Sequence, residues 1–480
     1  MTILYHISLY LYLFAVLLVS PFSQKAALFY KGRIGLMNRI GREMAKLLEE
    51  SNLCNGGVGQ CNICNSGSGA GDEECAIETG DISGVLWVHC ASVGEFEQAR
   101  PVIEGYRERN PADKVVLSFF SPSGYELRKD YALADKVFYL PIDTARNARK
   151  FIEAVKPTTA IFIKYEFWRN YLKVLKRKGV PTYLVSGIFR EDHHFFRWWG
   201  GTFRKVLRAF THFFVQDENS RRLLSSIGFE NATISGDTRF DRVYKIAKES
   251  KEIEIDRDFV AAGAVPVIII GSSWPADENI ISECRSKLPP AKLIIAPHEI
   301  GERHIEQLSG LFGRERCIRY TQFPGSTKQG AVQNESREQN CDTSDDVSQK
   351  GSIVPGSATA QESLLVIDTI GILSSIYKYG LIAYIGGGFG AGIHNILEAA
   401  VYGIPVVFGP RCQKFKEARD LLALGGAFSV SNSEEYCAIM ERLLSDTSYR
   451  VECGAICKKY VKDNLGATDK ILEQIQMERT

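Results

Sequence analysis

The chain has 480 residues, of which 45% are hydrophobic and 24% are charged, and its net charge is +1. The length is sufficient for two or three domains, and the composition is that of an ordinary globular protein. Because the net charge is close to zero, the composition gives no reason to expect a nucleic-acid partner.

The first 24 residues differ from the rest. Residues 2–22 contain no Asp, Glu, Lys or Arg and are rich in Leu, Ile, Val and Tyr. A run of this length can cross a bilayer core as a helix, and the absence of a preceding Lys or Arg argues against a cleaved signal peptide. We therefore expect a membrane anchor over residues 1–24, with the body of the protein on the cytoplasmic side because basic residues follow the run. A buried core helix is the alternative, and an anchor could either span the membrane or only dip into it.

The segment 51–82 is rich in Gly, Asn and Ser and contains no Lys or Arg. We interpret it as a flexible insertion. Its four cysteines are Cys54, Cys61, Cys64 and Cys75, and the Cys61-x-x-Cys64 spacing is compatible with a zinc site. The other eight cysteines are scattered, which is typical of reduced thiols in a cytoplasmic protein.

Apolar runs that alternate with amphipathic stretches predict β-strands separated by helices from residue 84 onward. The expected strands of this first series are 85–89, 114–119, 136–140, 160–163, 182–185, 213–215 and 232–234, and residues 97–110 are expected to form a helix. This alternation indicates a parallel sheet of βαβ units.

A second series of the same kind follows a charged stretch at 245–259. Its expected strands are 267–270, 292–296, 363–367, 381–385 and 406–408, with a helix at 415–424. The polar segment 325–362 has too few large apolar groups to fold, so we expect a disordered loop. The predicted class is α/β, with two Rossmann-like domains facing a cleft and ligands bound beyond the carboxyl ends of the strands.

These patterns predict five segments in the chain. They are a membrane anchor (1–24), an N-terminal domain (25–245), a linker (246–262), a C-terminal domain (263–465) and a C-terminal helix or tail (466–480).

Five glycines lie within the seven residues Gly386 to Gly392, directly after an expected strand and before a stretch that reads as a helix. Glycine lets the backbone approach a phosphate closely, and the first N–H groups of a helix can bind an anion. The segment therefore indicates a nucleotide-sugar site, with Asn395 and Glu398 placed to bind hydroxyl groups. A plain tight turn is the alternative.

Several segments together resemble the 3-deoxy-D-manno-octulosonic acid (Kdo) transferases of lipopolysaccharide core synthesis, from the N-terminus to about residue 465 and apart from the two insertions. No single motif is decisive, but their order and spacing are specific. The matching segments are 89–95 (HCASVGE), 121–126 (SPSGYE), 139–143 (YLPID), 166–168 (EFW), 236–241 (GDTRFD), 296–298 (APH), 368–371 (DTIG), 386–399, 403–405 (GIP) and 408–410 (FGP).

The resemblance implies a GT-B glycosyltransferase that moves Kdo from CMP-Kdo to a lipid A precursor, lipid IVA, with inversion at the sugar. It implies an acceptor-binding N-terminal domain on inner-membrane lipids at the cytoplasmic face, a CMP-binding C-terminal domain, and no metal or other cofactor.

The resemblance also implies the catalytic residues. Glu95 matches the base that removes the proton of the acceptor hydroxyl, although a carboxylate in the first turn of a helix can also serve the helix dipole. Arg239 matches a position usually held by Lys, where a cation could steady the leaving phosphate or the Kdo carboxylate, and a salt bridge with Asp237 or Asp241 is the alternative. Lys164 stands where the family has a carboxylate, so that role is not transferred to it.

For the donor, the resemblance places CMP against the C-terminal domain. Pro297 and His298 match a Pro-Arg pair that contacts CMP, and the segment from Ile370 through Gly371 to Ile372 matches backbone that holds the cytosine. The remaining positions of the predicted CMP-Kdo site are Asn395, Ile396, Leu397, Glu398 and Ser273.

On the acceptor side we expect Ser92, Glu166 and Arg197, the last within the aromatic and basic stretch 193–210. Such a stretch suits a membrane interface or a phosphorylated glycolipid, and core packing of half its aromatic residues is the alternative. Two other functions remain open: another GT-B enzyme, either a different glycosyltransferase or a UDP-sugar epimerase, and a non-catalytic, membrane-tethered nucleotide-binding module.

Overall fold

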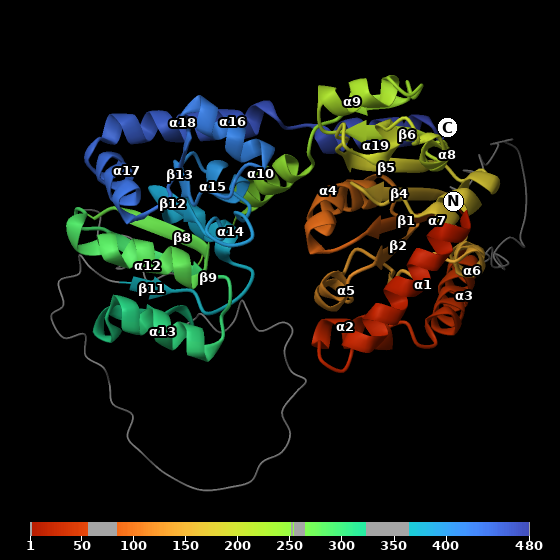
Figure 1. The fold of residues 1–480 in the computed structure, drawn as a ribbon, viewed down its shortest axis with the longest axis horizontal. Coiled ribbons are helices and arrows are strands. Elements are labelled where there is room, and N and C mark those ends of the chain that lie inside the picture. The colour runs from red at the N-terminus through yellow and green to blue at the C-terminus, as the bar shows by residue number, and fades with distance from the viewer. Residues whose placement is uncertain (1, 56–83, 251–252, 254–264, 323–363, 480) are drawn as a thin grey trace, which may run out of the picture. The chain divides into compact units, whose positions relative to one another are not determined.

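The computed structural model describes residues 2–55, 84–250, 253, 265–322 and 364–479. These residues form two units (Figure 1). Unit 1 consists of Met1–Arg242 and Leu465–Thr480, and unit 2 of Val243–Asn464. The boundary lies within helix α10 (Arg239–Glu249), and both predicted insertions, 51–82 and 325–362, lie almost wholly outside the described residues.

Unit 1 contains a seven-stranded sheet in which every strand pair is parallel, in the order β3-β2-β1-β4-β5-β6-β7. The strands consist mainly of buried apolar residues because helices cover both faces. All seven strands of the first predicted series are confirmed, with small shifts of their ends. They are β1 (Val85–Cys90), β2 (Lys114–Phe119), β3 (Lys136–Tyr139), β4 (Thr159–Ile163), β5 (Thr182–Gly187), β6 (His212–Val215) and β7 (Ala232–Ile234).

Alternate residues of β1 enter different cores. Trp87 packs on the face covered by α3, α6 and α7, whereas Leu86 and Val88 pack on the face covered by α4 and α19. The helices of unit 1 are α1 (Thr2–Val19), α2 (Gln24–Lys31), α3 (Leu36–Asn55), α4 (Val93–Arg109), α5 (Pro122–Arg128), α6 (Ala145–Val155), α7 (Arg169–Arg177), α8 (Gly201–Leu207), α9 (Glu218–Ser225) and α19 (Ala467–Met477), with a short 3₁₀ turn at His194–Phe196.

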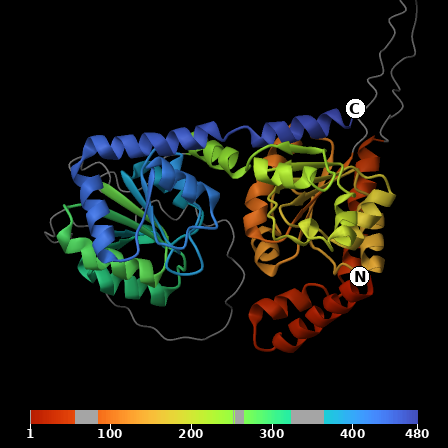
Figure 2. The ribbon, with the colours of Figure 1, turned by 45° about the horizontal axis from the view of Figure 1, so that its top comes forward.

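The C-terminal helix α19, blue in Figure 2, lies against unit 1. Ile471, Leu472 and Ile475 enter the same core as residues of α4. A Cβ at Gly105 of α4 would lie 2.5 Å from Leu472, so glycine permits this close approach. The last helix is therefore part of the N-terminal unit, which the sequence pattern did not indicate.

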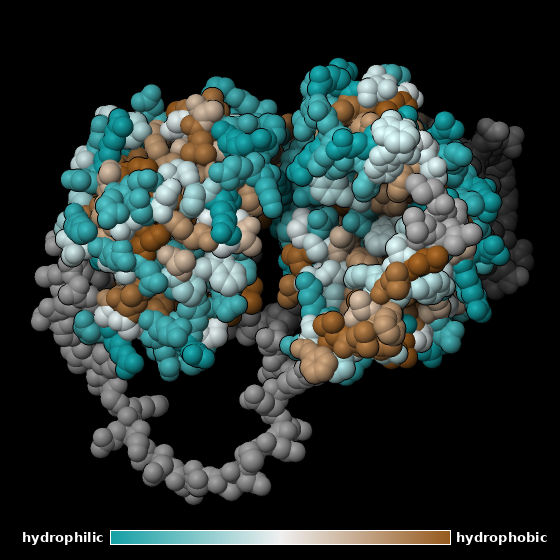
Figure 3. Space-filling model, in the orientation of Figure 1, coloured by the Kyte–Doolittle hydropathy of each residue, from teal (hydrophilic) through white to brown (hydrophobic). Residues whose placement is uncertain are grey.

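Helix α1 packs on unit 1 through Leu9, which is buried in a small cluster with Phe29 and Ile142. The Tyr5 hydroxyl donates a 2.6 Å hydrogen bond to Oδ2 of Asp143, a carboxylate whose pKa is raised by burial. The outer side of α1 is nevertheless apolar, and Figure 3 shows hydrophobic side chains running along α1 and α2. Within the described residues, no helix combines the length and apolarity that a membrane crossing requires. Helix α1 docks on the fold through Leu9 and Tyr5.

Arg33 joins the α1–α2 hairpin to the sheet. Its guanidinium donates to the carbonyl oxygens of Leu140 (3.1 Å), Phe29 (3.0 Å) and Phe120 (2.7 Å), and it lies 3.7 Å from the centre of the Phe29 ring. Burial lowers the pKa of Arg33 to about 10. These contacts replace the water that the cation loses on burial.

We expect Arg33→Met to lower the free energy of unfolding by about 2 kcal/mol, because three carbonyl oxygens lose a charged donor. Urea unfolding of the full chain measures this change. Lys31→Met is the matched control, because Lys31 is exposed at the end of α2. Equal stability of the two variants would contradict the structural role of Arg33.

Unit 2 repeats the architecture, with a seven-stranded parallel sheet in the order β10-β11-β9-β8-β12-β13-β14. Two short strands, β10 and β14, were not predicted. The strands are β8 (Val267–Ser273), β9 (Lys292–Pro297), β10 (Cys317–Arg319), β11 (Leu364–Val366), β12 (Ile382–Ile385), β13 (Val406–Phe408) and β14 (Ala427–Ser429). The α-helices are α12 (Pro275–Cys284), α13 (Glu302–Phe312), α14 (Leu373–Ile376), α15 (Leu397–Ala400), α16 (Lys416–Leu424), α17 (Ser433–Ser445) and α18 (Thr447–Asp463).

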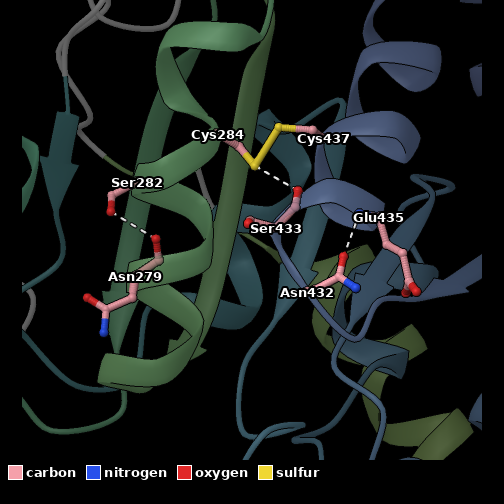
Figure 4. Close-up of a disulfide and its surroundings, with 7 residues drawn as sticks. All are labelled: Asn279, Ser282, Cys284, Asn432, Ser433, Glu435 and Cys437. Carbon is pink, nitrogen blue, oxygen red and sulfur yellow. Dashed lines mark hydrogen bonds between the residues drawn. A yellow bond between two sulfur atoms is a disulfide. The ribbon is translucent and has the colours of Figure 1, made fainter.

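Two cysteines of unit 2 are bonded to each other. Cys284 ends α12 and Cys437 lies in α17, and their Cα atoms are 5.7 Å apart (Figure 4). The expectation that the scattered cysteines are all reduced is therefore wrong for this pair. The other described cysteines outside 51–82 are free, namely Cys90, Cys317, Cys412, Cys453 and Cys457.

Candidate functional site

The order of strands places the candidate residues at one position in each unit. In unit 1 the chain order reverses between β1 and β4, and in unit 2 between β8 and β12. Open parallel sheets bind ligands beyond the carboxyl ends of the strands at such switch points. Glu95 follows β1 and Glu166 follows β4, whereas Trp274 follows β8 and the glycine segment follows β12.

Glu95 lies in the first turn of α4, directly after the loop that leaves β1. Its Oε2 accepts hydrogen bonds from the backbone N–H (3.1 Å) and the hydroxyl of Ser92. Its Oε1 has no hydrogen-bond donor within the described residues. Glu95 therefore caps the helix through one carboxylate oxygen, and this contact orients the other oxygen. Helix capping and the predicted role of catalytic base are thus compatible.

Hydrogen bonds join a set of polar side chains from β1, β2 and the segment after β4. His89 is fully buried, and its Nε2 lies 3.2 Å from Oε2 of Glu166. Trp168 donates its indole N–H to the same Glu166 oxygen at 2.5 Å, and Nδ1 of His89 lies 2.9 Å from Oγ of Ser118. Glu166 is therefore held in place by two rings, and it remains partly exposed.

Arg239 is held by a buried carboxylate. Its Nε and Nη2 lie 2.9 and 2.8 Å from Oδ2 of Asp237, whose Oδ1 accepts from Gln98 at 3.0 Å. The predicted salt bridge with Asp237 is confirmed, and it occupies one edge of the guanidinium. Burial raises the pKa of Asp237, but the charges of Arg239 and Lys164 and the hydrogen bonds from Arg239 outweigh it, so the net shift is downward.

Lys164 stands at the carboxyl end of β4 with a left-handed backbone, at φ +59°. Such a conformation is strained for a residue with a side chain, and it is common at functional sites. Lys164 and Arg239 both lower the pKa of Asp237, so these two cations lie near one buried carboxylate.

We expect Asp237→Asn to lower the free energy of unfolding at pH 7 by about 3 kcal/mol, because it leaves Arg239 without its buried counter-charge. The folded-state pKa of Asp237 is depressed. Its stabilising contribution is therefore present above the unfolded-state pKa and is lost as the pH falls through the folded value.

The difference in stability between the wild type and Asp237→Asn should accordingly shrink when urea unfolding is repeated at pH 3. Asp130→Asn serves as the control, because Asp130 is exposed in the same unit. A difference that is constant from pH 7 to pH 3 would refute the ionic role of Asp237.

In unit 2, the glycine segment packs backbone on backbone. A Cβ at Gly386 would lie 2.2 Å from the Ser272 carbonyl oxygen, and one at Gly388 would lie 2.6 Å from the Gly409 backbone. Gly387 has φ +91° and donates its N–H to Asp277 at 3.0 Å. Within the described residues, the next two N–H groups, of Gly388 and Phe389, have no acceptor and could bind an anion.

The helix expected after this loop is only the four-residue α15. The segment 393–396 that precedes it is not helical, and Gly403 at φ +76° follows soon after its end. The aligned peptide dipoles of so short a helix are few, so a helix N-terminus is not the main anion-binding device here. The predicted cradle therefore depends on the loop itself.

The structure brings His298 to this loop and buries other predicted ligands. His298 is exposed after β9, with its ring stacked 4.5 Å from Trp274 and 4.6 Å from His394. Pro297 is buried at the end of β9, and the buried Ser273 hydroxyl donates to Glu278 at 2.8 Å. The Ser273 hydroxyl therefore serves a hydrogen bond inside the protein and not a contact with CMP-Kdo.

Asn395 and Glu398 form one polar group. Asn395 donates to Oε1 of Glu398 at 3.0 Å, and Ser374 donates to its Oε2 at 2.7 Å. Ile396 and Leu397 are fully buried, so only their backbone could contact a ligand.

The segment predicted to hold the base lies just before α14. Ile370 is 78% exposed, Gly371 has φ +98°, and Ile372 caps the helix. On the acceptor side of the prediction, Arg197 is exposed beside Trp198, which is 92% exposed. Neither segment has a contact that assigns it a ligand.

The described residues contain no group of three His, Cys, Asp or Glu side chains that could hold a metal ion. Cys61, Cys64 and Cys75 lie outside those residues, and the side chain of Cys54 is not described. The sequence indicated that Trp274 lines the site, but it did not predict the hydrogen bonds that join Trp168 to His89 and Trp274 to His394. For His89 and Trp274 the available signal was their position at, or directly after, the carboxyl end of a switch-point strand, whereas Trp168 and His394 lie farther along the following loops.

Comparison with known proteins agrees with the motifs. A family model described as 3-Deoxy-D-manno-octulosonic-acid transferase (kdotransferase) matches residues 66–242. The 3-deoxy-D-manno-octulosonic acid transferase of Aquifex aeolicus (strain VF5) is 26% identical over 369 residues, which cover 75% of this chain and 86% of that protein. The transferase of the same name from Bordetella pertussis is 22% identical over 413 residues, covering 82% of this chain and 86% of that protein.

Among solved structures, the UDP-GlcNAc 2-epimerase from Neisseria meningitidis bound to UDP-GlcNAc has a TM-score of 0.54 at 16% identity, covering 82% of this chain and 99% of that one. At this identity the likeness concerns the fold alone, and it confirms the α/β class with two parallel sheets of the GT-B type. The motif resemblance is also confirmed: the chain is a relative of the Kdo transferases over most of its length, and it is a glycosyltransferase.

Proposed function

We propose that this chain transfers Kdo from CMP-Kdo to a lipid A precursor, lipid IVA, with inversion at the anomeric carbon. The observation that carries the proposal is the geometry of Glu95 within the region that matches the Kdo transferase model. One carboxylate oxygen is fixed by Ser92, and the other has no donor among the residues that the structure describes. The Kdo group follows from the names of the relatives, and CMP and lipid IVA follow from the motif resemblance.

In this reaction the acceptor hydroxyl attacks the anomeric carbon of Kdo from the face opposite the phosphate. Glu95 takes the hydroxyl proton as the new C–O bond forms, and the bond to the phosphate oxygen breaks as CMP leaves. Positive charge develops on the sugar ring in such a transition state. Glu166, held by His89 and Trp168, is the other carboxylate of this strand edge that could face that charge.

Anionic groups of the substrates require cations and N–H donors. In unit 1 we assign Lys164 and Arg239, the two cations that act on Asp237, to a carboxylate or phosphate of a substrate. In unit 2 we assign the N–H groups of Gly388 and Phe389, together with His298, to the nucleotide, with Asn395 and Glu398 on its hydroxyl groups.

We expect Glu95→Gln to reduce turnover at least 100-fold, because an amide cannot take the proton. CMP release from CMP-Kdo in the presence of lipid IVA measures this change. The amide oxygen still accepts from Ser92, so the unfolding midpoint should remain near the wild-type value.

Glu97→Gln is the matched control on the next turn of α4, where Glu97 binds Arg128 at 3.1 Å, and it should retain turnover. A folded Glu95→Gln variant with near-normal turnover would remove Glu95 as the base. CMP binding by a wild type that never releases CMP from CMP-Kdo would favour the nucleotide-binding module. Turnover with UDP-sugars instead would favour another GT-B activity.

We also propose that the chain works at the cytoplasmic face of the inner membrane, with the outer side of α1 in the lipid interface. Support comes from exposed apolar side chains on this helix, among them Leu11 (62%), Phe14 (58%) and Leu18 (58%). Lys25 and Lys31 follow on α2 and could pair with anionic lipid headgroups.

We expect Phe14→Ser combined with Leu18→Ser to weaken binding to vesicles of mixed zwitterionic and anionic lipid by about tenfold or more, because two large apolar groups leave the interface. Co-sedimentation measures the bound fraction. The control is Leu127→Ser combined with Leu424→Ser, because both leucines are exposed on other helices. Vesicle binding that is unaffected by the α1 changes would contradict this localisation.

A further inference from the structure

Three aromatic rings meet beside the glycine segment of unit 2. Trp274 follows β8, His298 follows β9, and His394 lies in the loop after β12. The His298 ring stacks on both of the others, at 4.5 Å from Trp274 and 4.6 Å from His394. The Trp274 Nε1 lies 3.2 Å from Nε2 of His394.

This last contact determines the protonation of His394. The indole N–H can only donate a hydrogen bond, so Nε2 of His394 must accept it and can carry no proton. An imidazolium has a proton on both nitrogens and cannot make this contact. The ring is therefore neutral, with its proton on Nδ1.

The surroundings agree with a neutral ring. Burial and the neighbouring His298 lower the pKa of His394 to about 4. The other charged groups around the loop are Asp277, which binds the Gly387 N–H, Arg411, which binds the Gly390 carbonyl oxygen, and Glu398 after Asn395. None of these three groups contributes to the lowering of the His394 pKa.

The ring is also held in place by the loop. A Cβ at Gly387 would lie 3.0 Å from Cδ2 and 3.2 Å from Nε2 of His394, so this edge of the ring packs against the backbone. The opposite nitrogen, Nδ1, has no hydrogen-bond partner in the described part of the chain. Its N–H is therefore available to a ligand, near the two unpaired N–H groups of Gly388 and Phe389.

We propose that Trp274 is a positioning residue that fixes His394 as the Nδ1–H tautomer, so that His394 donates a hydrogen bond to an anionic phosphate oxygen bound at the glycine segment. A neutral donor of fixed tautomer binds this oxygen equally well across the neutral pH range, whereas a free histidine would gain or lose a proton there. The identity of the ligand rests on the proposed function, but the tautomer does not.

The tautomer can be measured without any ligand. In the full chain labelled with ¹⁵N-histidine, the His394 signals are assigned by their loss in His394→Gln. We expect the protonated nitrogen to be Nδ1 at pH 7 in the wild type. In Trp274→Phe, which keeps a stacking ring but removes the donor, we expect a mixture with Nε2–H and a higher His394 pKa. An Nε2–H wild type, or an unchanged tautomer in Trp274→Phe, would overturn the proposal.

Binding of CMP tests the second part of the proposal, the hydrogen bond from His394 to the phosphate, which we call the ligand half. At pH 8 we expect Trp274→Phe to bind CMP about fivefold more weakly than the wild type, as for the loss of one neutral hydrogen bond. The ratio should stay near this value at pH 6.5, because burial and His298, both of which the variant keeps, hold the His394 ring neutral there. Using the ratio at each pH cancels the titration of the CMP phosphate itself.

Trp198→Phe is the control, because Trp198 is 92% exposed in unit 1, and it should leave CMP binding unchanged. Equal CMP affinity of the wild type and Trp274→Phe at pH 8, or no measurable CMP binding by the wild type, would overturn the ligand half. Absence of Kdo transfer with the expected CMP ratios would refute the proposed function and leave this inference standing.

Discussion

The position of the candidate site residues in both units depends on one constraint, the reversal of strand order in two parallel sheets. At β1 and β4 in unit 1, and at β8 and β12 in unit 2, neighbouring connections leave in opposite directions and open a space beyond the strand ends. The buried strands supply stability, and the residues that follow them are free to carry chemistry. Non-glycine residues with left-handed backbone occur there in both units, at Lys164 after β4 and at Ser272 near the end of β8. Such strain persists only where the surrounding fold compensates for it.

At both switch points, structural groups leave one polar atom available. The Ser92 cap takes one oxygen of Glu95 and leaves the other. In the same way, Trp274 takes one nitrogen of His394 and leaves the other. Away from the switch points, Asp237 likewise orients Arg239, which follows β7. In each case a neighbouring group fixes the orientation of the side chain, so little conformational entropy remains to be lost when a substrate binds.

Much of the fold could be predicted from the sequence, because buried parallel strands are nearly continuous apolar runs such as 114–119 and 267–270. The strands β10 and β14 were not predicted; each has three residues and is only partly buried. The predicted strand β7 is equally short and exposed, so such strands give a signal too weak to be detected consistently. The dependence of α19 on unit 1 could not be predicted either. Its apolar face is visible in the sequence, but its partner, α4, is more than 350 residues away.

The sequence predicted where several candidate residues lie in the fold, but it did not predict which side chains they contact. Glu95 was expected near a ligand and follows the switch-point strand β1. His298 follows β9, but its ring contacts Trp274 and His394 after β8 and β12, and Glu398 lies in α15. However, Ser273, Ile396 and Leu397 proved to be buried, because a motif does not reveal which of its side chains turn inward. The docking of α1 depends on Tyr5 meeting Asp143, 138 residues away, and no local pattern encodes that contact.

The most direct test of the account is the mass of the acceptor after the full chain is incubated with CMP-Kdo and lipid IVA in mixed micelles. We predict that the mass increases by one or more Kdo residues and that the product is absent when CMP-Kdo is replaced by UDP-GlcNAc. An unchanged acceptor mass with intact, folded protein would contradict the central claim.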